Sequence, residues 1–294
     1  MSRDAATRTL RVGLTQFHPT RDVERNLVVA CRLLARAGRD GADLVLLPEN
    51  ALMLGTNAEM RSAAFSLDSS ALSCIARAAA LNRVTVVLGG VKVSLEGESR
   101  PRNRALIYGP DGRSAGQYDK IHLFDAQVEG QSFEASSVEQ AGSTPVLLDV
   151  GGTLVGLTIC YDLRFPELYR QLALAGAEVV LAPSAFTRIT GRAHWETLLR
   201  ARAIENELYV VASATIGTNE DDAFQTYGHA SVIDPWGEVV VDLEDAEEAC
   251  RVVELDIGTI GRVREMLPVL KSVRPDAYVA PVARFSTVDD RGGH

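Results

Sequence analysis

The sequence predicts an α/β fold in which mixed β-sheets are covered by helices. Apolar, β-branched runs of strand length alternate with stretches of helical periodicity, which is typical of βα units. Elsewhere two such runs are separated only by a short turn sequence, Pro-Asp-Gly, Gly-Gly or Pro-Trp-Gly, which indicates β-hairpins and antiparallel pairing. The predicted strands are numerous enough for two sheets stacked on each other.

The first elements are a strand, a helix and a buried strand. Residues 10–17 alternate apolar with polar or small residues, as a strand does, and residues 23–37 show helical spacing. The expected apolar face of this helix consists of Leu27, Ala30, Cys31 and Leu34. The apolar run within residues 43–49 predicts a strand buried on both faces. That strand places Glu49 at its carboxyl end, where functional groups collect in open α/β sheets.

The middle of the chain is predicted to contain a helix, a strand and two hairpins around a long loop. The ranges are 58–81 for the helix, 84–90 for the strand, 103–118 for the first hairpin, 126–144 for the polar loop and 146–159 for the second hairpin. Loops of that length inside compact domains are usually functional. We therefore expect the loop to contribute to a site.

The remaining elements continue the α/β pattern to a strand that closes a sheet. They are a helix at 166–175, a strand at 178–182, a helix at 192–206, a strand at 208–213, a hairpin at 229–242 and a strand at 250–255. No repeat or linker interrupts them, so we predict one domain over residues 1–294. Its core covers about 9–256 and a C-terminal extension about 257–294, with a frayed polar tail from Ser286.

Composition and charge exclude several classes of function. The 294 residues carry a net charge of -9 and no concentrated basic cluster, which argues against a nucleic-acid partner. We find neither an apolar segment of signal-peptide type nor a run of membrane-spanning length, so we expect a cytoplasmic protein that does not enter a membrane. The four cysteines lack Cys-x-x-Cys spacing, which predicts free thiols rather than disulfides or a zinc site.

Cys160 is the candidate nucleophile. A short apolar strand ends on it, and a helix restarts at Pro166 with proline in its first turn. At such a junction the backbone N–H groups just past the cysteine are not committed to a ladder, so they can stabilise a thiolate and later an oxyanion. The alternative is that Cys160 only packs under the helix, as buried cysteines commonly do.

Glu49 and Lys120 are candidate partners of this thiol. A carboxylate at the end of an apolar run is costly to bury unless it has a partner or a task, although Glu49 could also begin a solvated loop. Lys120 taken alone would be a surface charge. Together, a carboxylate base, a fixed ammonium and a thiol can attack a carbonyl or nitrile carbon. His122 is either a hydrogen-bonded structural histidine or a direct participant.

Three motifs resemble the catalytic motifs of the nitrilase superfamily of carbon–nitrogen hydrolases. They are Leu46-Leu-Pro-Glu-Asn50, Tyr118-Asp-Lys-Ile-His-Leu-Phe-Asp125 and Thr158-Ile-Cys-Tyr-Asp-Leu-Arg-Phe-Pro-Glu167, and residues 194–206 are also similar to the family. The resemblance implies a four-layer αββα sandwich with two mixed β-sheets, a Glu-Lys-Cys triad at Glu49, Lys120 and Cys160, and no metal or organic cofactor. It also implies a homodimer formed through the helix at 166–175.

The resemblance further implies a second glutamate in the loop after the lysine motif. Glu134 is the best match in this sequence, and Glu139 is the alternative. The chemistry implied is acyl transfer: a thioester forms on Cys160, ammonia leaves and water hydrolyses the thioester.

The residues around the nucleophile indicate the branch of the family. Cys160-Tyr-Asp-Leu-Arg164 most resembles the ω-amidase and deaminated glutathione amidase group, which hydrolyses side-chain amides of α-keto acid amides. Tyr161 and Arg164 are the candidate substrate-binding residues. The Arg164 guanidinium either binds a substrate carboxylate or pairs with a neighbouring acid, Asp162 or Glu167. The alternative functions are an N-carbamoyl amino acid amidohydrolase, a nitrilase, and a catalytically silent binding or assembly subunit.

Overall fold

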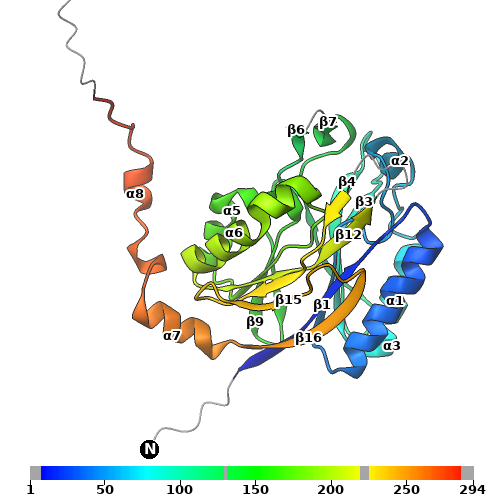
Figure 1. Ribbon diagram of the computed structural model, residues 1–294, viewed down its shortest axis with the longest axis horizontal. Helices are drawn as coiled ribbons and strands as arrows, with labels where there is room; N and C mark the ends of the chain where they lie inside the picture. The colour runs from blue at the N-terminus through cyan, green and yellow to red at the C-terminus, as the bar shows by residue number, and fades with distance from the viewer. Residues whose placement is uncertain (1–7, 129–130, 219–224, 286–294) are drawn as a thin grey trace, which may run out of the picture.

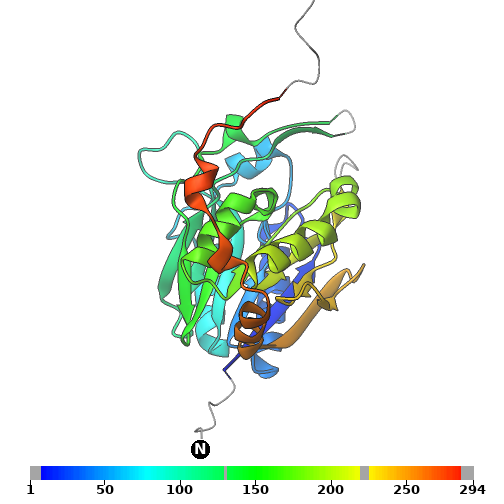
Figure 2. The same cartoon turned by 90° about the vertical axis from the view of Figure 1, so that its left-hand side faces the viewer.

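Two large β-sheets lie face to face between outer layers of helices (Figure 1 and Figure 2). The computed structural model describes residues 8–128, 131–218 and 225–285. Helices α1 (Val23–Arg39) and α3 (Ser70–Asn82) cover the outer face of one sheet, and α5 (Pro166–Leu174) and α6 (Arg188–Asn206) cover the other. The predicted αββα sandwich with two mixed sheets is therefore confirmed.

The first sheet has eight strands in the order β13-β12-β1-β2-β3-β4-β5, with β16 also paired to β1. Its strands are β1 (Thr9–Phe17), β2 (Leu44–Leu47), β3 (Thr85–Val93), β4 (Arg102–Tyr108), β5 (Ser114–Asp119), β12 (Ala214–Thr218), β13 (Gln225–Tyr227) and β16 (Glu248–Asp256). Strands β1, β2 and β3 are parallel, and β4 and β5 continue the sheet antiparallel. The carboxyl ends of the parallel strands meet at one edge, and Glu49 follows β2 there.

The second sheet has six strands in the order β15-β14-β11-β10-β9-β8. Its strands are β8 (Leu147–Val150), β9 (Thr153–Leu157), β10 (Val179–Leu181), β11 (Tyr209–Ala212), β14 (Ser231–Ile233) and β15 (Val239–Asp242). Strands β9, β10 and β11 are parallel to one another. The chain runs from the end of β9 directly to Cys160.

The two sheets approach closely beside these strand ends. A β-carbon at Gly89, in β3, would lie 2.5 Å from the carbonyl oxygen of Leu47 and 2.5 Å from the β-carbon of Pro183. Only glycine allows such contact, because any side chain would push the end of β2 away from the segment that follows β10. Gly89 thus brings the residues after β2 near those after β10 and β9.

Two buried apolar clusters hold the layers together. The larger lies between the sheets and continues under α5 and α6, where Trp195 and Tyr169 are the largest buried side chains. The smaller lies between α1, α3 and the first sheet. In α1 the buried side chains include Val29 and Leu33, whereas Leu27 and Cys31 are half-buried. The buried face of α1 is therefore rotated by part of a turn relative to the face predicted from the sequence.

Other sequence predictions need correction. The stretch predicted as one helix at 58–81 forms two, α2 (Asn57–Ser62) and α3, because Phe65 between them pairs with the end of β3 through bonds to Lys92 and Ser94. The side chain of Ser69 then caps α3. The loop predicted at 126–144 contains β6 (Asp125–Val128), β7 (Gln131–Glu134) and the short helix α4 (Ala135–Val138). Strands β12 and β13 were not predicted.

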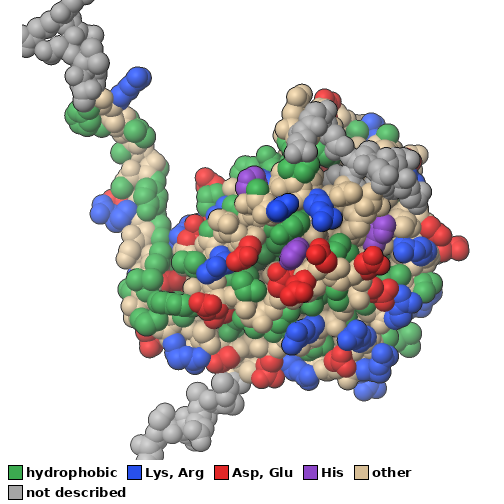
Figure 3. Space-filling model, viewed as in Figure 1, with side chains coloured by type: hydrophobic (Ala, Val, Ile, Leu, Met, Phe, Trp, Pro, Cys, Tyr) green, Lys and Arg blue, Asp and Glu red, His purple; other side chains and the backbone are tan. Residues whose placement is uncertain are grey.

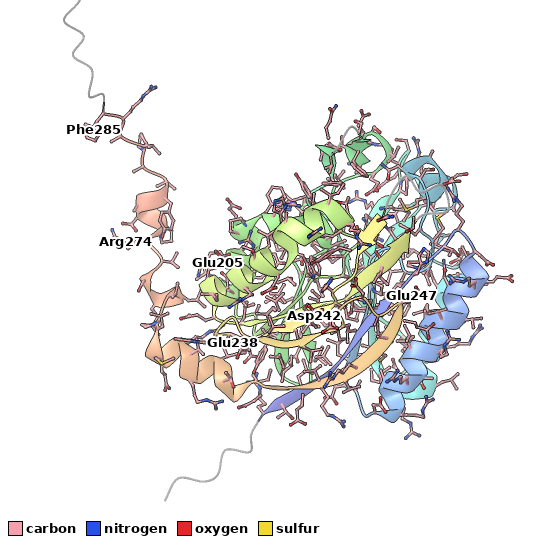
Figure 4. The ribbon with its side chains drawn as sticks, in the orientation of Figure 1. Glu205, Glu238, Asp242, Glu247, Arg274 and Phe285 are labelled. Carbon is pink, nitrogen blue, oxygen red and sulfur yellow. The ribbon has the colours of Figure 1, made fainter. Side chains whose placement is uncertain are left out.

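The C-terminal extension leaves the sandwich. Helix α7 (Gly258–Met266) buries Ile260 and Val263, and it is followed by a short 3-10 helix (Leu270–Ser272) and α8 (Pro275–Tyr278). From there the chain runs away from both sheets (Figure 1 and Figure 2), and Figure 4 shows Arg274 and Phe285 on this outlying segment. The tail from Ser286, predicted to fray, lies outside the described residues.

Candidate active site

A cavity of about 540 Å³ opens beside the strand ends of both sheets. Charged and polar side chains converge on it from β3, β4, the segments after β2 and β5, the loop after α4, and the 3-10 helix Cys160–Arg164. They are Glu49, Asn50, Lys92, Asn103, Lys120, Glu139, Cys160, Tyr161 and Arg164. The predicted triad residues therefore line one cavity although they are far apart in the sequence.

Glu49 and Lys120 form a buried ion pair. The Lys120 Nζ atom lies 2.8 Å from Glu49 Oε1, and both side chains are about 5% exposed or less. The Asn103 side-chain amide donates to the same oxygen at 2.9 Å, and the Ala185 backbone N–H donates to Oε2 at 3.0 Å. Because every bond reaches the carboxylate from a fixed direction, Glu49 has a defined orientation toward the cavity. Glu49 is therefore buried and paired, and it does not begin a solvated loop.

Cys160 begins the 3-10 helix with strained backbone. Its φ is +49°, in the left-handed region that costs a residue with a β-carbon about 1–2 kcal/mol. Its N–H donates to the Pro183 carbonyl at 3.0 Å, which anchors the turn to the end of the neighbouring strand. The Cys160 side chain and the Glu49 carboxylate line the same cavity. Strain of this kind persists where the surroundings hold a side chain in one working position.

The charges define the protonation state of the three groups. Burial alone would raise the pKa of Glu49, but the ammonium groups of Lys120 and Lys92 hold that pKa below its ordinary value. Burial would lower the pKa of Lys120, but Glu49 and the other acids around it raise that pKa instead. Burial and the Glu49 carboxylate raise the pKa of the Cys160 thiol. The resting site therefore holds a neutral thiol beside an ionised carboxylate, which is the arrangement a general base requires.

Asp162 connects the lysine motif to the cysteine motif. Its buried carboxylate accepts from the Tyr118 hydroxyl at 2.7 Å, the His122 backbone N–H at 3.0 Å and the Ile159 backbone N–H at 2.9 Å. The His122 ring contacts Asp162 at 2.7 Å and stacks on Phe165 with ring centroids 3.6 Å apart. These bonds hold the segment of Lys120 against the turn of Cys160. These contacts fit the alternative in which His122 is a hydrogen-bonded structural histidine. His122 is not among the residues that line the cavity.

Tyr161 and Arg164, the candidate substrate-binding residues, lie on the cavity wall. The Arg164 guanidinium lies 5.2 Å from the Phe186 ring centroid and 5.9 Å from that of Tyr161, and it contacts the His194 ring at 3.2 Å. Within the described residues Arg164 makes no ion pair with Asp162 or Glu167, because the Asp162 carboxylate is occupied elsewhere. The guanidinium therefore keeps its capacity to bind a carboxylate.

The structure places Glu139, and not Glu134, in the cavity. Glu134 is the exposed residue before α4, and its carboxylate contacts the Ser132 hydroxyl at 3.3 Å. Glu139 follows α4 and is buried, with its carboxylate 2.7 Å from the ammonium of Lys92. The short helix between the two glutamates turns the second one inward. The location of the two side chains therefore favours the alternative, Glu139, over Glu134, and the role of either glutamate in the reaction stays a prediction.

Comparison with known proteins decides the family. The family model described as carbon-nitrogen hydrolase matches residues 11–265, which is most of the chain. The chain belongs to the carbon-nitrogen hydrolase family. The resemblance to the nitrilase superfamily, first seen in three motifs, is thereby confirmed.

Two proteins similar to this carbon-nitrogen hydrolase are amidases by name. The chain is 37% identical over 254 residues to the deaminated glutathione amidase of a Synechocystis strain, covering 85% of this chain and 93% of that protein. It is 32% identical over 271 residues to the omega-amidase NIT2 of Mus musculus, covering 92% of this chain and 97% of that protein.

The crystal structure of the Caenorhabditis elegans NitFhit protein has the same fold. It superposes with a TM-score of 0.85 at 36% identity, covering 93% of this chain and 67% of that chain. NitFhit is a fusion of nitrilase and fragile histidine triad parts, and in the sequence comparison the present chain spans 65% of its length.

Sequence reasoning missed three residues of this carbon-nitrogen hydrolase site. Asn103 binds the triad carboxylate, Asp162 joins two motifs, and Lys92 pairs with Glu139. Lys92 could have been found, because it is a charged residue within an apolar strand, as Glu49 is at the end of one. The neutral Asn103 gives no comparable signal.

No helix within residues 8–128, 131–218 and 225–285 has both the length and the apolar character needed to cross a membrane. In the same part of the chain no group of three or more His, Cys, Asp or Glu side chains is arranged to hold a metal ion.

Proposed function

We propose that this carbon-nitrogen hydrolase is a thiol-dependent amidase that cleaves the side-chain amide of a small carboxylated substrate and releases ammonia. The observation that carries the proposal is the buried Glu49–Lys120 ion pair, which lines the main cavity together with Cys160. The names of the relatives, deaminated glutathione amidase and omega-amidase, support a substrate that carries both an amide and a carboxylate.

The first chemical step is addition of sulfur to the amide carbon. Cys160 Sγ forms the new C–S bond while its proton passes to the Glu49 carboxylate, and the carbonyl electron pair moves onto oxygen. Protonation of Glu49 weakens its hold on Lys120, because the ion pair loses one of its charges. The Lys120 ammonium and the Tyr161 backbone N–H then bind the oxyanion.

The second half of the reaction regenerates the site. Glu49 returns its proton to the nitrogen as the C–N bond breaks, so ammonia leaves and a thioester remains on Cys160. A water molecule that gives its proton to Glu49 attacks the thioester carbon, and the C–S bond breaks as sulfur takes the proton back. The products are one carboxylic acid and one ammonia for each amide and water consumed.

The charge of the cavity suits an anionic substrate. Its wall carries three cations, Lys92, Lys120 and Arg164, and two carboxylates, Glu49 and Glu139, while Cys160 is a neutral thiol. One positive charge is therefore left without a partner in the empty site. Arg164 is the cation among these with no carboxylate contact in the described residues, so it is the group we assign to the substrate carboxylate.

Substitution of Arg164 by lysine tests this assignment. A lysine keeps the charge but loses the bidentate fork, so we expect KM for a carboxylated amide to rise about tenfold or more, as for the loss of a charge-assisted hydrogen bond. We expect KM for a matched amide without the carboxylate to change less than about twofold. Steady-state kinetics on both substrates, with Arg192→Lys on the exposed face of α6 as control, measures this. Equal losses on both substrates would contradict carboxylate recognition.

The proposed activity is tested by ammonia release from a matched set of compounds. The set comprises α-ketoglutaramate, α-ketosuccinamate, deaminated glutathione, butyramide, an N-carbamoyl amino acid and a simple nitrile. We expect release to be fastest from the carboxylated amides. Release from the carbamoyl compound or the nitrile alone would contradict the amidase assignment. Silence on every compound, together with a Cys160 that iodoacetamide does not label, would favour a non-catalytic binding subunit.

We also propose that two chains form a homodimer through the α5–α6 side of the sandwich. Support comes from apolar side chains exposed on those helices. More lie along the C-terminal extension, where Figure 3 shows apolar side chains gathered. They include Leu174, Ile189, Ile204, Tyr278, Val279, Val282 and Phe285. Exposed apolar area of this extent commonly marks an interface. Light scattering should give twice the chain mass, and a monomer at working concentration would contradict the dimer.

The same proposal places the enzyme in a reducing, cytoplasmic compartment as a single catalytic domain. All four cysteines are free thiols, and Cys160 can act as a nucleophile only while it stays reduced.

A further inference from the structure

A second buried ion pair shares the cavity with the proposed triad. Lys92, on β3, lies with its ammonium 2.7 Å from a carboxylate oxygen of Glu139, and their side chains are 8% and 5% exposed. Among the ion pairs between described residues, only this one and Glu49–Lys120 have both side chains so deeply buried. Both pairs line the same cavity, so four charges of alternating sign meet there.

Stability alone gives no reason for this pair. Removing two charges from water costs about as much as their attraction returns, so a buried ion pair is often no more stable than apolar side chains of the same volume. Lys92 lies in a strand whose neighbours are apolar and buried, where a methionine would fit the pattern. The pair is therefore explained better by what it does to the other charges of the cavity.

The backbone holds Glu139 in the cavity independently of Lys92. The Glu139 N–H donates to the Ala135 carbonyl at 2.8 Å, and the next N–H, of Gln140, donates to the Pro101 carbonyl at 2.9 Å. Two residues later the Gly142 N–H donates to the Lys120 carbonyl at 2.8 Å. The segment is thus fastened beside the triad lysine, and the Glu139 carboxylate stays in the cavity even if its cation is removed.

Without Lys92, two carboxylates would face a single ammonium. Glu49 and Glu139 would compete for Lys120, and in a buried site one of two such carboxylates takes up a proton. Lys120 and Lys92 act on Glu49 electrostatically, and the donors that bind its oxygens from Asn103 and Ala185 are uncharged. Arg164, the third cation of the cavity wall, contacts His194 and lies over Phe186, and it makes no ion pair with Glu49 in the described residues.

We propose that Lys92 is a positioning residue for amide hydrolysis: its ion pair neutralises Glu139 and so keeps Glu49 ionised and able to accept the proton of Cys160. The role in turnover rests on the proposed amidase function. The role in activating the thiol does not depend on which substrate is bound. Lys92 acts through Glu139 and Glu49 and needs no contact with substrate.

The test is the pH dependence of Cys160 alkylation by iodoacetamide, followed by peptide mass spectrometry. In Lys92→Met the acid limb of the alkylation rate should move upward by about one pH unit, which is a tenfold slower reaction at a fixed pH on that limb. In Glu139→Gln the acid limb should stay at the wild-type pH or move to lower pH, because Lys92 then acts on Glu49 alone. The double variant Lys92→Met/Glu139→Gln should return to within about twofold of wild type.

Controls separate this effect from misfolding. Lys271→Met removes an exposed lysine of the C-terminal extension and should leave the limb unchanged. Lys92→Gln removes the charge but can still donate to Glu139, so it serves where the methionine variant fails to fold, and thermal unfolding is measured for each variant. A limb that stays at the wild-type pH in both Lys92 variants would overturn the proposal. A double variant as impaired as Lys92→Met would overturn it too.

The same variants distinguish this inference from the proposed function. Ammonia release from the carboxylated amides should follow the same limb in the wild type and in the two Lys92 variants. If the wild type hydrolyses no amide but the alkylation limb moves as described, the amidase assignment fails and the role of Lys92 in activating Cys160 stands. If the wild type hydrolyses amides and neither limb moves, the inference about Lys92 fails alone.

Discussion

Replacement of Cys160 by alanine should lower ammonia release by about 10⁴-fold or more. The reason is that Cys160 is the cysteine among the residues that line the cavity, so its removal leaves no sulfur there to form the C–S bond. The fold should persist, because the backbone bond from residue 160 to the Pro183 carbonyl does not involve the side chain. Steady-state ammonia release from a carboxylated amide, with equal thermal unfolding temperatures for both proteins, measures the effect.

Cys31→Ala is the matched control for this variant. Cys31 is a half-buried thiol on α1 with its sulfur 3.7 Å from that of Cys74, outside the cavity. We expect it to keep wild-type turnover within about twofold. A Cys160→Ala enzyme that retained more than a few per cent of wild-type activity would show that another group is the nucleophile.

Substitution of Glu49 by glutamine should lower kcat by about 10²–10⁴-fold, the range expected for loss of a general base. Glutamine has the same shape, but it cannot take the thiol proton. Asn103 and Ala185 donate to different oxygens of Glu49, so the single carbonyl oxygen of glutamine can accept from only one of them. Because glutamine is uncharged, the substitution also leaves Lys120 without a carboxylate partner at position 49. Turnover and the rate of Cys160 alkylation should therefore fall together.

Glu134→Gln is the matched control, because Glu134 is an exposed glutamate outside the cavity. It should retain wild-type kcat, and a large loss in this variant would contradict the placement of Glu139 in the site.

The wild-type pH profile tests Glu49 as the general base. Because the pKa of Glu49 is lowered, its ionised form and the ion pair with Lys120 persist below the ordinary glutamate range, and both are lost as pH falls through the lowered pKa. The acid limb of kcat/KM should therefore lie below the ordinary pKa of glutamate.

The sequence indicated the candidate residues Glu49, Lys120 and Cys160 more clearly than the residues that surround them in the structure. Glu49 and Cys160 were visible because each stands at the end of a short apolar strand, and the strands themselves follow from local patterns. Their meeting could only be inferred from the resemblance to a family. It depends on the close approach of the two sheets at Gly89, which no local pattern reveals.

The residues that were misplaced depend on contacts between distant segments. Glu134 and Glu139 are five positions apart, and only the short helix α4 between them decides which one turns inward. Phe65 interrupts a helical pattern because it pairs with the end of β3, a tertiary contact that overrides propensity. The neutral residue Asn103 carries no signal in the sequence, yet it binds the triad carboxylate.

The central claim is that the acyl group of the substrate is carried by Cys160. It is tested most directly by acid quenching the wild-type enzyme during turnover of α-ketoglutaramate and measuring the mass of the peptide that contains Cys160. We expect a mass increase equal to the acyl group on that peptide, removable by hydroxylamine and absent from Cys160→Ala. Ammonia release accompanied by an adduct on a different side chain, or continuing in Cys160→Ala at the wild-type rate, would contradict the account.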